Sequence, residues 1–284
     1  MADVVGVGGA GEAYARPTKT ATDAYVEIAG AAKTYRRGGR ETHALERIDL
    51  AIREGEFLAI VGPSGCGKST LLRMVAGLHL PTTGEVHVDG ARVDRPQTNL
   101  GIVFQSPVLL DWRTALANVL MQVELRGMDP REYRDRALRL LDQVGLKEFA
   151  DRYPHELSGG MRQRVGIARA LAVRPAILLM DEPLSALDSQ TRELLMEDFI
   201  GLLADGTMGA VYVTHNLEEA VRLADRIVVL SRRPGRVREI VEIPMTRAER
   251  GAIDARGKLL ALQNDLWSLI REEAIDAERE VQHA

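Results

Sequence analysis

Cysteine is nearly absent from this chain, whose 284 residues include one, Cys66. A single cysteine cannot form a disulfide within the chain, which excludes a disulfide-stabilised secreted domain and agrees with a reducing cytosol. Long apolar runs are missing too, because no uninterrupted apolar stretch approaches the roughly 20 residues that cross a bilayer. We therefore expect a protein that acts on a membrane, if at all, through partner subunits.

Excess positive charge is absent as well. The chain has 37 Lys and Arg against 41 Asp and Glu, so its formal net charge at pH 7 is -4. Binding to a nucleic-acid backbone needs a basic surface, and the sequence therefore predicts no nucleic-acid partner. Residues 1–23 lack the basic start and apolar centre of a secretory signal. We expect them to form a flexible N-terminal tail.

A phosphate-binding loop is the most informative feature that is present. The apolar run 57–61 before it predicts a buried strand, and residues 69–76 after it predict a helix. Glycines at such a strand-to-helix turn let backbone N–H groups approach phosphate oxygens. The loop fits the pattern G-x-x-x-x-G-K-[ST] at every fixed position, with the residues Gly62, Pro63, Ser64, Gly65, Cys66, Gly67, Lys68, Ser69 and Thr70.

Two side chains of this loop complete the predicted nucleotide site. Lys68 would bring its charge to the β- and γ-phosphates, and the Ser69 hydroxyl would ligate Mg²⁺. The sequence thus predicts a bound nucleoside triphosphate with magnesium. For Cys66 two interpretations stay open: a small filler, or a residue whose alkylation weakens ATP binding.

A pair of carboxylates ends a second apolar run. Residues 177–180 predict another buried strand, and Asp181 and Glu182 follow it. Ligands bind at the carboxyl ends of strands in open parallel sheets. We therefore expect Asp181 to hold Mg²⁺ and Glu182 to take a proton from the attacking water. General-base catalysis of this kind contributes about 100- to 10,000-fold in rate.

A second helix start that suits phosphate lies at residues 157–163. Ser158 is a good N-cap, and Gly159 and Gly160 permit close backbone approach. The segment has no lysine of its own. We therefore interpret it as a donor of contacts to a nucleotide that is held elsewhere.

These motifs, in this order, resemble the ATP-binding subunit of ABC transporters from about Tyr25 to Val241. Residues 157–163 match the family's signature sequence, and residues 185–188 match its D-loop. The resemblance implies that Tyr35 stacks on adenine, that Gln105 of the Q-loop senses magnesium and water, and that His215 is the switch histidine.

The resemblance also implies a fold and an assembly. The expected fold is α/β, a P-loop NTPase of the ABC type with a parallel-sheet core, an antiparallel β-subdomain and a helical subdomain. In a head-to-tail homodimer, each ATP would lie between one subunit's phosphate loop and the other subunit's signature helix. The expected catalytic residues are Glu182, His215, Lys68 and Gln105, and the expected metal ligands are Ser69, Gln105 and Asp181.

The predicted organisation has three parts. The tail is followed by an ATP-binding domain at 24–245, with its helical subdomain at about 106–160, and then by a C-terminal helical extension at 246–284. Within the subdomain we expect helices at 114–125 and 130–144. The extension is expected to pack on its own subunit, with dimerisation as the alternative, through an apolar face of Leu259, Leu260, Leu262, Leu266, Trp267, Leu269 and Ile270.

Residues 107–114 and 231–237 resemble the branch of importers for nitrate, sulfonate and taurine. Asp111 replaces the branch's usual proline, and Asn216 its usual aspartate. The branch implies transmembrane permease subunits as partners, a solute-binding protein that acts indirectly, and a peripheral position on the cytoplasmic face of the inner membrane. Trp112 would either line the permease groove or anchor the helical subdomain from inside. The alternatives are a soluble ABC ATPase that is not coupled to transport, and a P-loop kinase.

Overall fold

The computed structural model describes residues 24–202, 207–250, 252 and 254–282. The predicted tail at 1–23 lies outside these residues. Within them, no helix combines the length and the apolar character that a membrane span requires.

An antiparallel sheet comes first along the chain. Its strands are β1 (Ala24–Arg37), β2 (Arg40–Arg53), β4 (Thr83–Val88) and β5 (Ala91–Arg92), in the order β2-β1-β4-β5. The resemblance implies an antiparallel β-subdomain, and the structure has two strands of 14 residues each at its start. Gly38 and Gly39 form the turn between these strands with φ of 57° and 78°, a region that glycine reaches without steric cost.

A second sheet forms the centre of the molecule. It consists of β3 (Phe57–Val61), β6 (Leu100–Val103), β7 (Ile177–Asp181), β8 (Gly209–Val213), β9 (Arg226–Leu230) and β10 (Val237–Glu242), in the order β10-β9-β3-β8-β7-β6. Strand β10 pairs antiparallel with β9, while the other neighbours are parallel. Every residue of β3, β7 and β8 is buried, which explains why these strands read as continuous apolar runs.

Eight α-helices complete the described part of the chain. They are α1 (Lys68–Val75), α2 (Ala115–Leu125), α3 (Pro130–Gln143), α4 (Gly159–Leu171), α5 (Ser189–Leu202), α6 (Leu217–Leu223), α7 (Arg247–Arg250) and α8 (Ala255–Gln282). The helices predicted at 114–125 and 130–144 match α2 and α3 to within one residue. Thr114 caps α2 by accepting a hydrogen bond from the Ala117 N–H at 3.2 Å.

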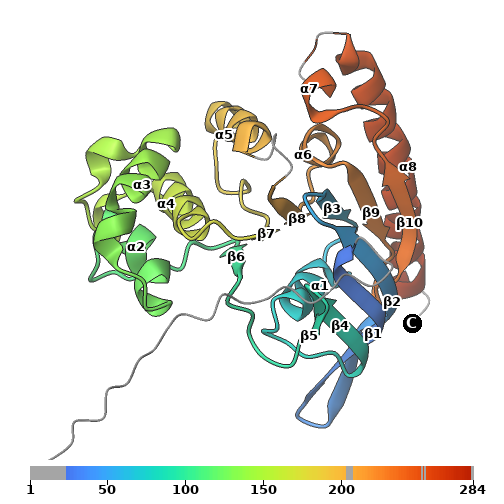
Figure 1. Ribbon diagram of the computed structural model, residues 1–284. Helices are drawn as coiled ribbons and strands as arrows, with labels where there is room; N and C mark the ends of the chain where they lie inside the picture. Colours follow the sequence, from blue (N-terminus) through green and yellow to red (C-terminus); the bar gives the residue numbers. More distant parts are fainter. Residues whose placement is uncertain (1–23, 203–206, 251, 253, 283–284) are drawn as a thin grey trace, which may run out of the picture.

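The two faces of the central sheet bury different cores. Phe57, Ala59 and Val61 of β3 belong to one apolar cluster, which includes residues of α2 to α6 and α8. Leu58 and Ile60 belong to a second cluster, which they share with α1 and the antiparallel sheet. Because side chains alternate along a strand, β3 contributes to both. Helix α1 therefore lies between the two sheets (Figure 1).

Helices α2, α3 and α4 form a separate lobe on the left of Figure 1, beyond β6 and β7. The structure has no strand between the end of β6 at Val103 and the start of β7 at Ile177, and the helices of the lobe contact one another through the first apolar cluster. Two short 3₁₀ segments, Lys147–Phe149 and Pro154–Glu156, connect α3 to α4. The helical subdomain predicted at about 106–160 contains α2 and α3, whereas α4 continues to Leu171.

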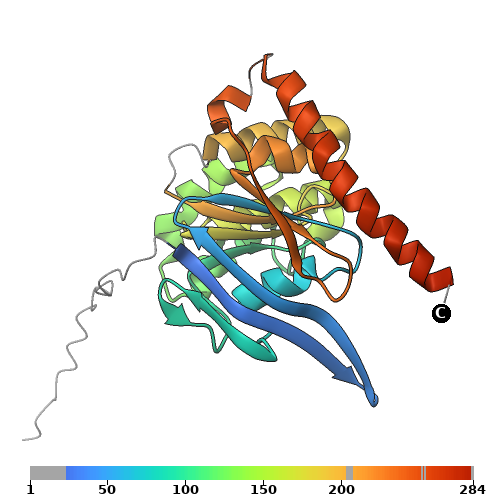
Figure 2. The same cartoon turned by 90° about the vertical axis from the view of Figure 1, so that its right-hand side faces the viewer.

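The C-terminal extension begins with α7 and continues as the long helix α8, which crosses the molecule beside α6 (Figures 1 and 2). Leu259 and Leu266 are buried, as an apolar face packed on its own subunit requires. Leu260 and Trp267 are 57% and 58% exposed. The prediction that these two residues share the packed face is wrong, because a helix carries them round to its other side.

Substitution of Leu266 by alanine should lower the free energy of unfolding by about 2–5 kcal/mol, because it leaves a cavity under α8. Leu260→Ala, on the exposed side of the same helix, should change it by about 0.5 kcal/mol or less. Denaturant titration of both variants measures the difference. Equal losses at the two positions would contradict the observed packing of α8.

Candidate nucleotide-binding site

Four neighbouring strands of the central sheet end at the same level. Ile60 of β3 lies opposite Val213 of β8, Asp181 of β7 lies opposite the same Val213, and Val103 of β6 lies opposite Met180. The segments that follow these strands carry the predicted site residues Lys68, Ser69, Gln105, Asp181, Glu182 and His215. The sheet therefore brings together side chains that are far apart in the sequence, at the edge where parallel sheets bind ligands.

The phosphate loop connects β3 to α1. Gly62, Gly65 and Gly67 have φ of 150°, 75° and 105°, which a residue with a Cβ adopts only with strain. Lys68 is buried, and its Nζ donates hydrogen bonds to the carbonyl oxygens of Gly62 and Pro63 at 2.9 and 3.0 Å. Gly67 caps α1 without a side chain, which leaves the first N–H groups of this helix for an anion.

Ser69 and Asp181 form the oxygen pair that could hold a metal ion. The Ser69 hydroxyl donates to Asp181 Oδ1 at 2.8 Å, and Asp181 is buried at the end of β7. A hydroxyl and a carboxylate are the hard oxygen ligands that Mg²⁺ prefers. Gln105, which the sequence also predicts as a ligand, places its carboxamide nitrogen 3.1 Å from Glu182 Oε2 instead.

The Glu182 side chain follows β7 and contacts residues that follow the two neighbouring strands, β6 and β8. Its Oε2 accepts from Gln105 after β6 and lies 3.3 Å from His215 Nδ1 after β8. Its backbone has φ of 47°, a conformation that costs a residue with a side chain about 1–3 kcal/mol and is found disproportionately at functional sites. This turn of the backbone separates the Glu182 side chain from that of Asp181. The neighbouring carboxylates therefore face different partners.

A buried hydrogen-bond network lies next to His215 in the chain. Glu219 of α6 accepts hydrogen bonds from the hydroxyls of Tyr212 at 2.7 Å and Thr214 at 2.8 Å. Burial first, and then the adjacent Glu219, raises the pKa of Tyr212 well above its usual value. Asn216 caps α6 by accepting from the Glu218 N–H at 2.9 Å. Sequence reasoning did not single out Glu219, although an N-cap followed by two acidic residues was its local signal.

Tyr35 of β1 reaches helix α1 and the segment that follows it from the antiparallel sheet. Its hydroxyl lies 2.8 Å from His79 Nδ1 and 3.4 Å from Thr70 Oγ1. Burial lowers the pKa of His79, and the charges of Arg73 and Lys33 lower it further, so the imidazole is neutral at pH 7. His79 has no motif around it and was not predicted. The stacking of Tyr35 on adenine stays a prediction.

Residues 157–163, which match the signature sequence, lie at the start of α4 in the helical lobe. The Ser158 hydroxyl accepts from the Met161 N–H at 3.2 Å and so caps α4, as predicted. Gln163, which is fully buried, donates to the Phe104 carbonyl at 3.0 Å and ties α4 to the segment before Gln105. Figure 1 shows α4 in the helical lobe, apart from α1. The chain does not bring Ser158, Gly159 and Gly160 to its own phosphate loop.

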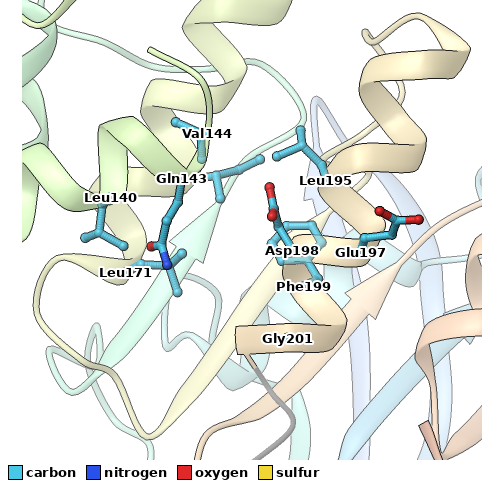
Figure 3. Close-up of a pocket in the computed structure, with 10 residues that line it drawn as sticks. Leu140, Gln143, Val144, Leu171, Leu195, Glu197, Asp198, Phe199 and Gly201 are labelled. Carbon is cyan, nitrogen blue, oxygen red and sulfur yellow. The ribbon is translucent and has the colours of Figure 1, made fainter. Parts of the chain in front are cut away.

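A pocket of the structure lies away from the predicted site residues. It lies between α3, α4 and α5, where Leu140, Leu171 and Phe199 line it together with Glu197 and Asp198 (Figure 3). Burial and the neighbouring Glu197 raise the pKa of Asp198. None of the predicted site residues lines this pocket.

Trp112 follows the segment that holds Gln105. It is 74% exposed, so the interpretation that it anchors the lobe from inside is wrong. The loop beneath it is fixed by Asn118 of α2, which is buried, accepts from the Leu110 N–H at 2.8 Å and donates to the carbonyls of Leu110 and Arg113 at 3.1 and 3.0 Å. The hydrogen bonds of Asn118 therefore fix the loop that carries the exposed Trp112 indole.

Cys66 occupies the phosphate loop but turns its side chain into the core. It has no exposed surface and belongs to the apolar cluster around α1. The residue therefore offers its backbone, and not its thiol, to a ligand. This geometry favours the filler interpretation over the one in which the thiol is open to alkylation.

A thiol reagent should therefore label Cys66 in the folded chain at least about tenfold more slowly than in the chain unfolded by guanidinium, because buried thiols are inert. The absorbance of the released thiolate dye follows both reactions. Equal labelling rates would show that the thiol is accessible in the native protein.

Comparisons with known proteins agree with this geometry. A family model described as ABC transporter matches residues 45–185. The taurine import ATP-binding protein TauB of Rhizobium johnstonii is 46% identical, over 78% of this chain and 84% of its own length. The nitrate import ATP-binding protein NrtD of Synechocystis is 48% identical, over 70% of this chain and 75% of its own.

A solved structure is similar as well. The ATP-binding cassette MJ0796, determined as a dimer in a post-hydrolysis state with ADP and Pi, is 38% identical, with a TM-score of 0.71 over 78% of this chain and all of that one. The sequence relatives and the matched fold show that this chain belongs to the ATP-binding subunits of the ABC transporters. It is an ATP-binding protein and an ATPase with the ABC-type α/β fold.

Proposed function

We propose that this protein powers an ABC importer for nitrate, a sulfonate, taurine or a related small solute. The observation that carries the proposal is the convergence of Gln105 and His215 on Glu182, beside the Ser69 and Asp181 pair. A kinase that phosphorylates a small molecule has no use for the signature segment in the helical lobe. The names of TauB and NrtD support import and this range of solutes.

The residues divide the work of hydrolysis. Lys68 and the N–H groups at the start of α1 bind the phosphates, which suits a charge that spreads over phosphoryl oxygens. Ser69 and Asp181 would hold Mg²⁺, which neutralises charge on the β- and γ-phosphates when bound. Glu182 accepts the proton of the attacking water, Gln105 orients that water, and His215 holds the Glu182 carboxylate and contacts the γ-phosphate.

The second wall of the site comes from another copy of the chain. Because Ser158 to Gly160 lie in the helical lobe, apart from α1, the donors that face the γ-phosphate from the far side belong to a head-to-tail partner. The dimeric state of MJ0796 supports this arrangement. Closing the dimer on ATP and opening it after hydrolysis is then the movement that drives transport.

Contact with the membrane subunits falls to the helical lobe. The exposed Trp112, on the loop that Asn118 fixes, lies seven residues after Gln105 and so connects a permease to the nucleotide site. The protein would sit on the cytoplasmic face of the inner membrane. A solute-binding protein acts on it only through the permease, so solute selection lies outside this chain.

Glu182→Gln should lower the ATPase rate by about 100-fold or more, because the amide cannot accept the proton, while ATP stays bound. The trapped nucleotide should hold the chain as a dimer. Analytical ultracentrifugation with ATP, and phosphate release, measure the two effects.

The matched control is Glu218→Gln, an exposed acidic residue at the start of α6, which should keep the parental rate. The specific activity of the parent should rise with protein concentration until the dimer is formed. Activity that is independent of concentration, or a Glu182→Gln variant with parental turnover, would contradict the assigned site.

Affinity purification of the tagged chain from membranes should recover a permease with several spanning helices. Trp112→Ala should lose the permease and solute uptake but keep the ATPase activity of the isolated chain. Trp267→Ala, at the other exposed tryptophan, should keep the permease. Recovery of ribosomal RNA without any membrane protein would instead support a soluble ATPase that is not coupled to transport.

A further inference from the structure

The segment Ser231–Arg236 belongs to residues 231–237, whose sequence resembles the importer branch. It packs against the phosphate loop. The Gly235 N–H donates to the Ala44 carbonyl at 3.0 Å, and the Glu46 N–H donates to the Gly235 carbonyl at 3.0 Å. These bonds make a single parallel bridge between Leu45 of β2 and Gly235. The bridge joins the antiparallel sheet to the chain that leaves β9 of the central sheet.

The phosphate loop rests directly on this bridge. A Cβ atom on Gly235 would lie 2.0 Å from the Cys66 carbonyl oxygen, and one on Gly67 would lie 3.0 Å from the Ala44 carbonyl oxygen. At the start of the loop, a Cβ on Gly62 would lie 2.7 Å from the Leu230 carbonyl oxygen. The end of β9 therefore lies close to the beginning of the loop, and the two segments of the bridge lie close to its end.

Ser231 joins the two ends of the segment by hydrogen bonds to Arg236. The Ser231 N–H donates to the Arg236 carbonyl at 2.9 Å, and the Arg236 N–H donates to Ser231 Oγ at 3.0 Å. The Arg236 guanidinium also bonds Glu46 of β2, with Nε 2.9 Å from Oε2. Gly235 is thus held in place by contacts on both of its sides.

We propose that Gly235 is a positioning residue for the phosphate loop, which sets the place of the backbone groups that hold the nucleotide's phosphates. Its own φ lies outside the left-handed region, so its backbone conformation does not require glycine. The requirement comes from the Cys66 carbonyl, which occupies the place of a side chain. This inference rests on the proposed nucleotide site.

A small displacement of the loop is enough to affect binding. The phosphates are held by backbone N–H groups in fixed directions, and losing one hydrogen bond to a charged group lowers binding affinity about tenfold or more. A methyl group at Gly235 would displace the Cys66 peptide of the loop. The atoms nearest to this methyl group belong to Cys66 and Leu45, and neither is a predicted catalytic residue.

The test measures ADP affinity of the full-length chain by titration calorimetry, well below the melting temperature of each nucleotide-free variant. Gly235→Ala should weaken ADP binding at least about tenfold, with a native circular dichroism spectrum. Ser231→Ala, which loosens the segment without adding an atom near Cys66, should weaken it at least about threefold. The control Gly257→Ala, in α8 with no atom within 4 Å of the added Cβ, should bind like the parent.

A merely structural role predicts a lower melting temperature with parental ADP affinity in the folded protein, and that result would overturn the proposal. Should Gly235→Ala fail to fold, Ser231→Ala decides: weaker binding supports the positioning role, and parental binding overturns it. A parent chain that binds no ADP would refute both this inference and the proposed function. Parental affinity in both variants would refute the positioning role alone.

Discussion

The nucleotide site depends on one constraint, the register of the central sheet. This register places the carboxyl ends of β3, β8, β7 and β6 at the same level. Backbone hydrogen bonding fixes the register of these strands, and each contributes one short segment beyond its end. Because the ends coincide, side chains from four distant parts of the chain meet around Asp181 and Glu182 without any long loop to position them. The strained backbone of Glu182 persists because strands on both sides hold its neighbours.

Much of this could be predicted from the sequence, because the relevant signals are local. The phosphate loop, the Asp181 and Glu182 pair and the Ser158 N-cap each lie within a few consecutive residues, and their spacing alone specifies a turn, a strand end or a helix start. Continuous apolar runs predicted β3 and β7 because both faces of these strands are covered. The helices of the lobe carry their own caps, such as Thr114.

What could not be predicted depends on contacts between distant segments. The pairing of Tyr35 with His79 and the bridge of Leu45 to Gly235 join residues separated by 44 and 190 positions, and no periodicity reports them. The exposure of Trp112 follows from a bonding pattern of the buried Asn118. In α8, hydrophobicity alone did not separate Leu266, which faces the core, from its neighbour Trp267, which faces away.

The hydrogen bond from Gln163 to the Phe104 carbonyl has a consequence for how two copies communicate. It fastens the helix that begins at Ser158 to the peptide beside Gln105, and Gln105 touches Glu182 of its own chain. In the proposed head-to-tail dimer, a rotation of the lobe that brings Ser158 to the partner's ATP would also move Gln105 in its own chain. Such a dimer would couple ATP binding at one site to the position of Gln105 at the other, and this coupling would be reciprocal in free energy.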